Sequence, residues 1–257
     1  MSRIHPTAVI DATAHIGQST VVGPYCVIGA QVTLGEGCRL HNNVTIAGPT
    51  RIGGGNEFYP YASIGHRSQD LKYEGEPTFL EIGEGNTFRE FVTANRGTMP
   101  GSVTRIGSNG TFLAYSHIAH DCTVGDHVIF SNNGTLAGHV TVGDHAVIGG
   151  LSGVHQFCRI GAHAIVGGCT KIVQDVPPFL IADGNPAEIR GVNIVGLERR
   201  GFTAESLRDL RDAYKVIYRN NLNTSQALDL LRERFASSEL VAYLVDFIAS
   251  SERGIVR

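Results

Sequence analysis

A six-residue spacing of apolar residues is the feature that most constrains the fold. Isoleucine, leucine, valine, phenylalanine or alanine occupies every sixth position in three blocks, 4–64, 82–94 and 106–172. This period matches neither the 3.6-residue turn of an α-helix nor the two-residue alternation of an ordinary strand. It is typical of a parallel β-helix, in which each hexapeptide supplies one short strand and one corner and successive coils stack.

The residues around the repeat agree with this mainly β fold. Small side chains such as Ala8, Ala14 and Cys26 lie two positions before the repeat residues, and 32 of the 257 residues are glycine. Glycine suits a fold with many tight corners. Three hexapeptides per coil predict a triangular prism of roughly nine coils, about 43 Å tall at ~4.8 Å per coil.

Two gaps in the repeat predict loops at 66–79 and 96–103, within a β-helix domain that spans residues 1–176. The period ends after Ile172, and Pro177-Pro178 marks the exit from the prism. A C-terminal helical domain is expected over 177–257. It contains a helix from Thr203, as N-cap, to about Arg219, and two further helices near 225–235 and 238–250. The basic start of this region is either a solvated helix face or a docking surface for an acidic partner or a phosphate.

Composition narrows the functional class. A formal net charge of -3 argues against a general nucleic-acid binder. The chain has neither an apolar run long enough to span a membrane nor the apolar core of a signal peptide, so we expect a cytoplasmic protein without a transmembrane segment. Four cysteines are expected to point inward, and Cys122 and Cys158, two coils apart, are too far apart for a disulfide. Cys169 lies near no zinc-like cluster.

Polar residues gather at one edge of the predicted prism. Counting coils places Ile64, Ala94, Ile118, Leu136 and Val154 in one column, and both loops leave at the corner that follows it. The same corner carries His120, Gly138 and Gln156, while Asp121 and His139 are stacked one coil apart, within reach of an ion pair. Convergent polar groups from separate segments indicate a site. The remaining corner histidines are interpreted as solvated residues: His15, His41, His127, His145 and His163.

Several motifs at this edge resemble those of UDP-N-acetylglucosamine O-acyltransferases, the family that catalyses the first step of lipid A biosynthesis. The resemblance covers nearly the whole chain. The motifs are His117-Ile-Ala-His120-Asp121, Leu136-Ala-Gly138-His139, Val154-His155-Gln156, Gln69-Asp70-Leu-Lys72-Tyr73, and Gly191-Val-Asn193 followed by Arg199-Arg200-Gly201-Phe202.

The resemblance implies a left-handed parallel β-helix followed by a C-terminal helical domain, assembled as a homotrimer with sites between neighbouring prisms. The implied reaction moves a 3-hydroxyacyl chain from the phosphopantetheine of acyl carrier protein to the 3-position of the sugar of UDP-N-acetylglucosamine. Neither a bound cofactor nor a metal is expected.

The resemblance also implies residue roles. His120 is the general base, Asp121 orients it, and the backbone N–H of Gly138 stabilises the oxyanion. Gly168 forms the floor of the acyl groove. The remaining matched residues bind substrate: Asp70, Lys72, His117, His139, His155, Gln156, Asn193, Arg199 and Arg200.

Other functions remain open at this point. Val195 and Asn95 differ from residues common in the family, and they bear on whether the acceptor presents a 3-hydroxyl or, as in a UDP-diamino-sugar, a 3-amino group. The related N-acyltransferase of the same pathway carries a domain ahead of its prism, whereas this repeat starts at Ile4. A zinc carbonic anhydrase of the hexapeptide fold would hold its metal with histidines from neighbouring chains. A non-enzymatic scaffold has no reason to break its repeat twice beside the same histidines.

Overall fold

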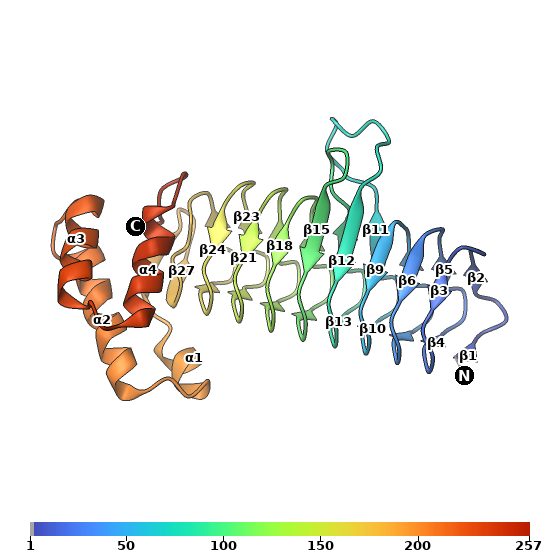
Figure 1. Cartoon of the computed structure of the whole chain (residues 1–257), viewed down its shortest axis with the longest axis horizontal. Helices are drawn as coiled ribbons and strands as arrows, with labels where there is room; N and C mark the ends of the chain where they lie inside the picture. Colours follow the sequence, from blue (N-terminus) through green and yellow to red (C-terminus); the bar gives the residue numbers. More distant parts are fainter. Residues whose placement is uncertain (1–2) are drawn as a thin grey trace.

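The computed structural model describes residues 3–257, which form a long column of short parallel strands with helices packed at its C-terminal end (Figure 1). The strands form three sheets, here called A, B and C, which are the faces of a triangular prism. Each strand pairs in parallel with the strand one coil away, commonly 18 residues along the chain, as His117 does with Thr135. The predicted column is confirmed, since Ile64 pairs with Ala94 and Ile118 with both Ala94 and Leu136.

The strands are short because each prism face is only one hexapeptide wide. Sheet A contains β1 (Arg3–Ile4), β4 (Val21–Val22), β7 (Arg39–Leu40), β10 (Glu57–Phe58), β13 (Thr87–Phe88), β16 (Thr111–Phe112), β19 (Ile129–Phe130), β22 (Val147–Ile148), β25 (Ile165–Val166), β27 (Leu180–Asp183) and β28 (Glu188–Val192). Sheet B contains β2 (Val9–Ile10), β5 (Val27–Ile28), β8 (Thr45–Ile46), β11 (Ser63–His66), β14 (Thr93–Asn95), β17 (His117–Ile118), β20 (Thr135–Leu136), β23 (Gly153–Val154) and β26 (Lys171–Ile172). Sheet C contains β3 (His15–Ile16), β6 (Val32–Leu34), β9 (Thr50–Ile52), β12 (Phe79–Ile82), β15 (Val103–Ile106), β18 (Thr123–Val124), β21 (Thr141–Val142) and β24 (Arg159–Ile160).

The repeat residues fill the interior of the prism. Phe58, Phe88 and Phe112 are fully buried, and their rings stack with centroids 4.9 and 4.8 Å apart. Burial of a phenylalanine side chain contributes about 1.5–3 kcal/mol, so this column is a large part of the local stability. The four cysteines expected to point inward, among them Cys122 and Cys158, are buried free thiols.

The corners use left-handed backbone at one residue per turn. Asp121 and His139 have φ values of 60° at the corner between sheets B and C, and His127, His145 and His163 have φ values of 55–59° at the corner between C and A. Asparagine, aspartate and histidine tolerate this conformation better than most residues with a side chain. The repeat therefore places polar side chains in register along each corner.

Three of the predicted solvated histidines stack on one another, although His127 at the end of the stack stays exposed, and a fourth is paired. The rings of His127, His145 and His163 lie parallel, with centroids 4.7 and 4.8 Å apart. His41 Nε2 lies 2.8 Å from Glu57 Oε1. The interpretation was wrong for His41, His145 and His163 because identical corner positions one coil apart bring side chains into contact, which a residue-by-residue reading does not consider.

The two loops leave the prism where the repeat is interrupted. They span residues 67–78, between β11 and β12, and 96–102, between β14 and β15, and the first protrudes from the prism (Figure 1). They are tied together by a 2.6 Å hydrogen bond between the Ser68 and Thr98 hydroxyls. The Asn95 amide also donates to Arg67 O at 2.8 Å.

The C-terminal region begins differently from the prediction. Strand stacking continues past residue 176, because β27 pairs in parallel with β25 and then turns back into antiparallel β28. A short helix that the sequence analysis did not anticipate follows, α1 (Ile194–Arg199). The other three helices are confirmed, with Thr203 accepting from Ser206 N as the N-cap of the first: α2 (Ala204–Arg219), α3 (Thr224–Arg234) and α4 (Glu239–Ala249).

The C-terminal tail closes the end of the prism. Asp175, which is 1% exposed, accepts from Arg159 Nε at 2.9 Å and from Ser251 Oγ at 2.8 Å. The backbone of Val256 donates to Asp175 O. These bonds hold the helical domain on the last coils. Within residues 3–257, no helix combines the length and the apolar character needed to cross a lipid bilayer.

Candidate active site

A cleft of about 650 Å³ runs along sheet B and the B–C corner, under the first loop. Its walls come from the loop and from successive coils of the prism. The lining residues are Gln69, Asp70, Leu71, His117, Ala119, His120, Thr135, Leu136, Ala137, Gly138, Gly153, Val154, His155, Gln156, Lys171 and Ile172. The structure thus brings together six of the predicted site residues in one cleft: Asp70, His117, His120, Gly138, His155 and Gln156.

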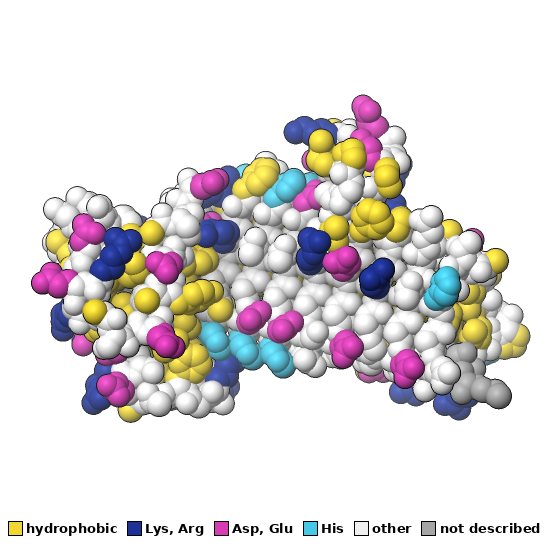
Figure 2. All heavy atoms as spheres, in the orientation of Figure 1, with side chains coloured by type: hydrophobic (Ala, Val, Ile, Leu, Met, Phe, Trp, Pro, Cys, Tyr) yellow, Lys and Arg dark blue, Asp and Glu magenta, His cyan; other side chains and the backbone are white. Residues whose placement is uncertain are grey.

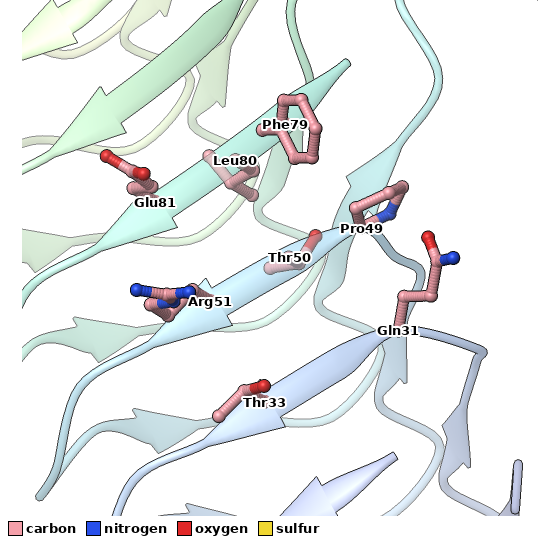
Figure 3. A pocket seen from close by; sticks show the side chains of 8 residues that line it. All are labelled: Gln31, Thr33, Pro49, Thr50, Arg51, Phe79, Leu80 and Glu81. Carbon is pink, nitrogen blue, oxygen red and sulfur yellow. The ribbon is translucent and has the colours of Figure 1, made fainter. Parts of the chain in front are cut away.

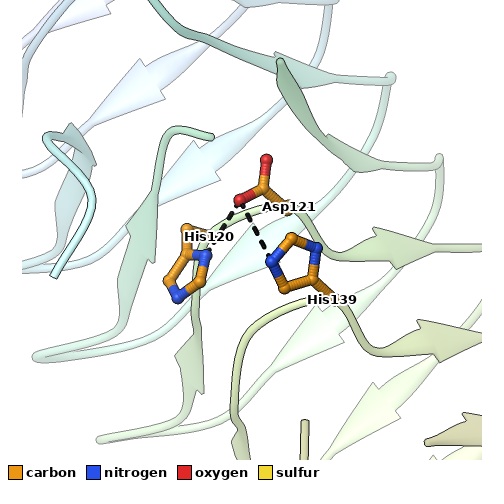
Figure 4. A group of neighbouring side chains, drawn as sticks. All are labelled: His120, Asp121 and His139. Carbon is orange, nitrogen blue, oxygen red and sulfur yellow. Dashed lines mark hydrogen bonds and ion pairs between the residues drawn. The ribbon is translucent and has the colours of Figure 1, made fainter. Parts of the chain in front are cut away.

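His120 lies at the centre of this cleft and is only 9% exposed. Its Nδ1 lies 2.9 Å from Asp121 Oδ2 (Figure 4). Its Nε2 lies 3.9 Å from Asp70 Oδ2. Because a carboxylate only accepts hydrogen bonds, the hydrogen atom lies on Nδ1 of His120, which donates to Asp121. A neutral His120 in this tautomer has its lone pair on Nε2.

Asp121 is held as a carboxylate by its surroundings. Burial raises the pKa of Asp121, but hydrogen bonds from His120 and Thr98, together with the nearby Ser102 hydroxyl, outweigh burial and lower it overall. The Thr98 backbone N–H donates to Oδ2 at 3.1 Å, and the N–H of Asp121 itself donates to Thr104 Oγ1 at 2.8 Å. The second loop therefore fixes the carboxylate that orients His120.

Gly138 is packed directly against the His120 ring. A Cβ atom on Gly138 would lie 2.3 Å from Cε1 and 2.5 Å from Nε2 of that ring, so only glycine leaves room for the imidazole here. The backbone N–H groups of Ala137 and His139 donate to Val154 O and His120 O. Among the described residues, the N–H of Gly138 between them has no acceptor, and it is available to a substrate oxygen.

Two further histidines lie beside His120 and Asp121. Burial, together with the nearby His120, lowers the pKa of His117, and its Nδ1 lies 2.7 Å from Thr93 Oγ1. His139 Nε2 lies 3.7 Å from Asp121 Oδ2, and its ring stacks on Phe157 with centroids 4.7 Å apart. His117 is thus a neutral polar group beside His120, whereas His139 approaches Asp121 from the next coil.

Metal-ligating residues also meet at this position. His120, Asp121 and His139 have donor atoms within 4.8 Å of one another and are the single such group of three in residues 3–257. The 2.9 Å separation of His120 and Asp121 is that of a charge-assisted hydrogen bond. The arrangement therefore suits proton transfer without a resident metal.

The other predicted site residues lie away from this cleft. Lys72 is exposed on the first loop, and its N–H donates to Asp70 Oδ1. Gly168 is exposed at the A–B corner, three residues before Lys171, which does line the cleft. Three residues lie beside the C–A corner: Asn193, which donates to His163 O, Arg200, which donates to His145 O, and exposed Arg199. One prism cannot gather all three corners around one substrate.

The partners of Asp121 were missed from the sequence. Thr98 and Ser102 lie in or beside the second loop, and Thr104 lies in β15. Their contacts depend on how the loop folds over the corner, and the hexapeptide repeat does not determine the conformation of the loop. The histidine stack, by contrast, could have been found from its 18-residue spacing, which equals one coil.

A second groove, of about 370 Å³, lies on sheet C (Figure 3). Its walls combine apolar, polar and charged residues: Gln31, Thr33, Pro49, Thr50, Arg51, Phe79, Leu80 and Glu81. It offers no counterpart to the His120–Asp121 pair. The cleft along sheet B is therefore the candidate active site.

Comparisons with known proteins agree on the family. One family model, described as UDP N-acetylglucosamine O-acyltransferase, domain 2, matches residues 175–256, and another, described as bacterial transferase hexapeptide (six repeats), matches residues 1–36 and 13–48. Acyl-(acyl-carrier-protein)–UDP-N-acetylglucosamine O-acyltransferases of Thermodesulfovibrio yellowstonii and Halorhodospira halophila are each 48% identical over 258 residues, which cover 100% of both sequences.

Solved structures give the same result. LpxA from Acinetobacter baumannii is 47% identical, with a TM-score of 0.96 over 99% of each chain. A UDP-N-acetylglucosamine acyltransferase from Arabidopsis is 37% identical, with a TM-score of 0.86 over 99% of this chain and 100% of that one. Together with the three stacked sheets, these similarities identify the fold as a left-handed parallel β-helix followed by a C-terminal helical domain.

Proposed function

The chain belongs to the acyl-(acyl-carrier-protein)–UDP-N-acetylglucosamine O-acyltransferase family of lipid A biosynthesis, and from this premise we propose that His120 is the general base of its acyl transfer. The observation that carries the proposal is the 2.9 Å contact between His120 Nδ1 and the Asp121 carboxylate, which leaves the Nε2 lone pair in the cleft. Imidazole titrates near neutral pH and accepts a proton readily in such a position.

The reaction then follows from these groups. His120 Nε2 takes the proton of the 3-hydroxyl of the sugar as that oxygen attacks the thioester carbonyl of the acyl donor. The Gly138 N–H donates to the oxyanion that develops on this carbonyl. When the intermediate collapses, the C–S bond breaks and the protonated His120 returns the proton to the departing thiolate of the phosphopantetheine. Asp121 stabilises the imidazolium formed in between, because its carboxylate lies 2.9 Å from Nδ1.

The acceptor is placed by the polar residues around the base. Asp70 and His117 lie beside His120, and His155 and Gln156 line the cleft one coil beyond Gly138. His139 approaches the carboxylate of Asp121 and lies within reach of the same substrate. Lys72 and the Arg199–Arg200 pair add cationic groups for the diphosphate of the nucleotide.

We infer that the site is completed by a neighbouring chain of a homotrimer. The catalytic pair lies at the B–C corner, Gly168 at the A–B corner and Arg199 beside the C–A corner, so only packing of separate prisms brings them together. Leu71, which lines the cleft, is 100% exposed at the protruding loop. A fully exposed leucine side chain beside a cleft is typical of a surface that contacts a second chain.

The donor is carried by acyl carrier protein, and the protein itself needs no bound cofactor. The surface of α2 presents Arg208, Arg211, Lys215 and Arg219, which suit an acidic carrier. Five free cysteines fit a reducing compartment, so the proposed location is the cytoplasm.

Substitution of His120 by alanine tests the proposal. We expect turnover of a 3-hydroxyacyl donor with UDP-N-acetylglucosamine to fall by at least ~100-fold, as loss of a general base requires. His15→Ala removes an exposed histidine elsewhere on the prism and should leave turnover unchanged. Near-normal turnover by folded His120→Ala would reject the assignment. The same assay with a UDP-diamino-sugar determines whether the chain also transfers to nitrogen.

A further inference from the structure

The C–A corner carries an imidazole stack that acyl transfer does not use. His127, His145 and His163 lie one coil apart, with ring centroids 4.7 and 4.8 Å apart and interplanar angles of 3° and 19°. Figure 2 shows a row of histidines along the prism next to the helical domain. Because each residue is held in the left-handed conformation, the three rings form a fixed column.

This histidine stack ends under the helical domain. The ring of His163 stacks on Phe179 at 5.8 Å and meets the edge of Phe202 at 5.0 Å, with an interplanar angle of 77°. Phe179 belongs to a buried cluster with Leu197 of α1. The stack is therefore continuous with the packing that seats α1 on the prism.

Polar contacts join both ends of α1 to the same column. Asn193 Nδ2 donates to His163 O at 2.9 Å, while Asn193 Oδ1 accepts from Gly196 N at 3.1 Å and caps the helix. After the helix, Arg200 donates to His145 O at 3.4 Å and to Gly196 O at 3.3 Å. Arg199, at the last position of α1, is left exposed.

The surroundings of His145 and His163 favour the uncharged form of both rings. Burial lowers the pKa of His163 to about 4, His145 and Arg200 act in the same direction, and Asp144 opposes them. Burial, Arg200 and His127 also lower the pKa of His145, against Asp144 and Asp126. In the described chain, His163 Nδ1 is buried without a hydrogen-bond partner. A neutral column lets the Arg200 guanidinium lie against it.

We propose that the histidine stack is a positioning element for the acceptor: it seats α1 and thereby places Arg199 to bind the nucleotide diphosphate. The inference rests on the proposed function, since the nucleotide-binding role of Arg199 belongs to that proposal. His163 is the positioning residue, because it contacts Asn193, Phe179 and Phe202 together.

His163→Ala tests the positioning role. It removes the ring that contacts Phe179 and Phe202, so α1 keeps its hydrogen bonds to the backbone of the corner but loses part of the aromatic packing beneath it. We expect KM for UDP-N-acetylglucosamine to rise about ten-fold, while kcat and the KM for the acyl donor stay within about two-fold. His163→Phe keeps the stack and should restore the wild-type KM. His41→Ala is the matched control, because it removes a corner imidazole that stacks on Tyr59 at 4.6 Å, outside this contact.

A second measurement covers the case in which His163→Ala does not fold. Calorimetric titration of wild type and His163→Phe with UDP-N-acetylglucosamine at pH 7.5 and 4.0 should give equal affinities at pH 7.5. At pH 4.0, near the pKa of His163, about half of the wild type carries a charge on this ring, so the wild type should bind about two-fold more weakly than the variant. Equal affinities at both pH values, or an unchanged KM in folded His163→Ala, would overturn the positioning role alone. Absence of transfer by the wild type would overturn the proposed function with it.

Discussion

At the residue scale, the site depends on how closely side chains on adjacent coils approach each other. His120 lies over Gly138, whose missing side chain leaves the space that the imidazole fills. Asp121 is held by Thr98 and Thr104, which come from different parts of the chain. Since His120 donates to this fixed carboxylate, its orientation is set before any substrate binds, which lowers the cost of reaching the transition state.

Gly138→Ala should therefore inactivate the enzyme although alanine is small. The new Cβ would overlap the His120 ring at 2.3–2.5 Å and displace it by about 1 Å, which costs about 100-fold in kcat. Steady-state kinetics measure this loss. Gly29→Ala is the control, because a Cβ there meets nothing closer than 3.5 Å. Full activity in Gly138→Ala would show that the ring does not need this space.

Part of the site followed from the sequence at this scale. The positions of His120, Gly138 and Gln156 on one corner, and of Asp121 beside His139, follow from counting hexapeptides. The partners of Asp121 did not follow, because Thr98 lies in a loop outside the repeat and its contact depends on loop conformation. Counting hexapeptides predicts the positions of side chains wherever the backbone follows the repeat.

At the scale of elements, the six-residue repeat aligns the corner residues of successive coils in columns. One column holds Asp121, His139 and Phe157, and another holds the histidine stack. The strands and the later helices were predictable, since hydrophobic period alone determines them. The β27–β28 hairpin and α1 were not, because they are held by contacts with the last coils, such as Asn193 with His163 O, rather than by a periodic pattern.

The histidine stack makes stability depend on pH. The pKa of His163 is about 4 in the folded chain and near 6.5 when unfolded, so the unfolded state binds more protons between these values. Stability is therefore lost as the pH falls from about 6.5 toward 4, by up to about 3 kcal/mol. His163→Phe cannot take up this proton and should lose less stability. Chemical denaturation at pH 7.5 and 4.5 measures the difference, and parallel losses in both proteins would contradict it.

At the scale of the whole molecule, each prism presents different parts of the site at its three corners. The His120–Asp121 pair, Gly168 and Arg199 lie at different corners of one chain. The homotrimer was proposed from resemblance to the family. This distribution of the residues over three corners supports the proposal that neighbouring chains complete each site.

Gly168→Met tests the proposed role of Gly168 as the floor of an acyl groove. A Cβ at Gly168 meets only Gly150 O, at 3.5 Å, so a larger side chain fits without strain. Each buried methylene contributes about 0.8 kcal/mol, so shortening the groove by two carbons should shift donor preference about ten-fold toward shorter chains. Competition between donors of different length measures this shift, with Gly29→Met as control. An unchanged preference would place the end of the groove elsewhere.

The most direct test of the account is complementation between two impaired variants, His120→Ala and Arg199→Ala, assayed at UDP-N-acetylglucosamine concentrations well below KM, where loss of a diphosphate contact lowers turnover. If each site takes His120 from one chain and Arg199 from its neighbour, trimers formed from an equal mixture contain intact sites with a probability of one quarter. We predict that the mixture, co-refolded to exchange chains, recovers about 25% of wild-type turnover. The double variant mixed with wild type should also give about a quarter, rather than about a half. Turnover of the mixture no higher than the average of the two single variants would show that both residues act within one chain, and would contradict the shared site.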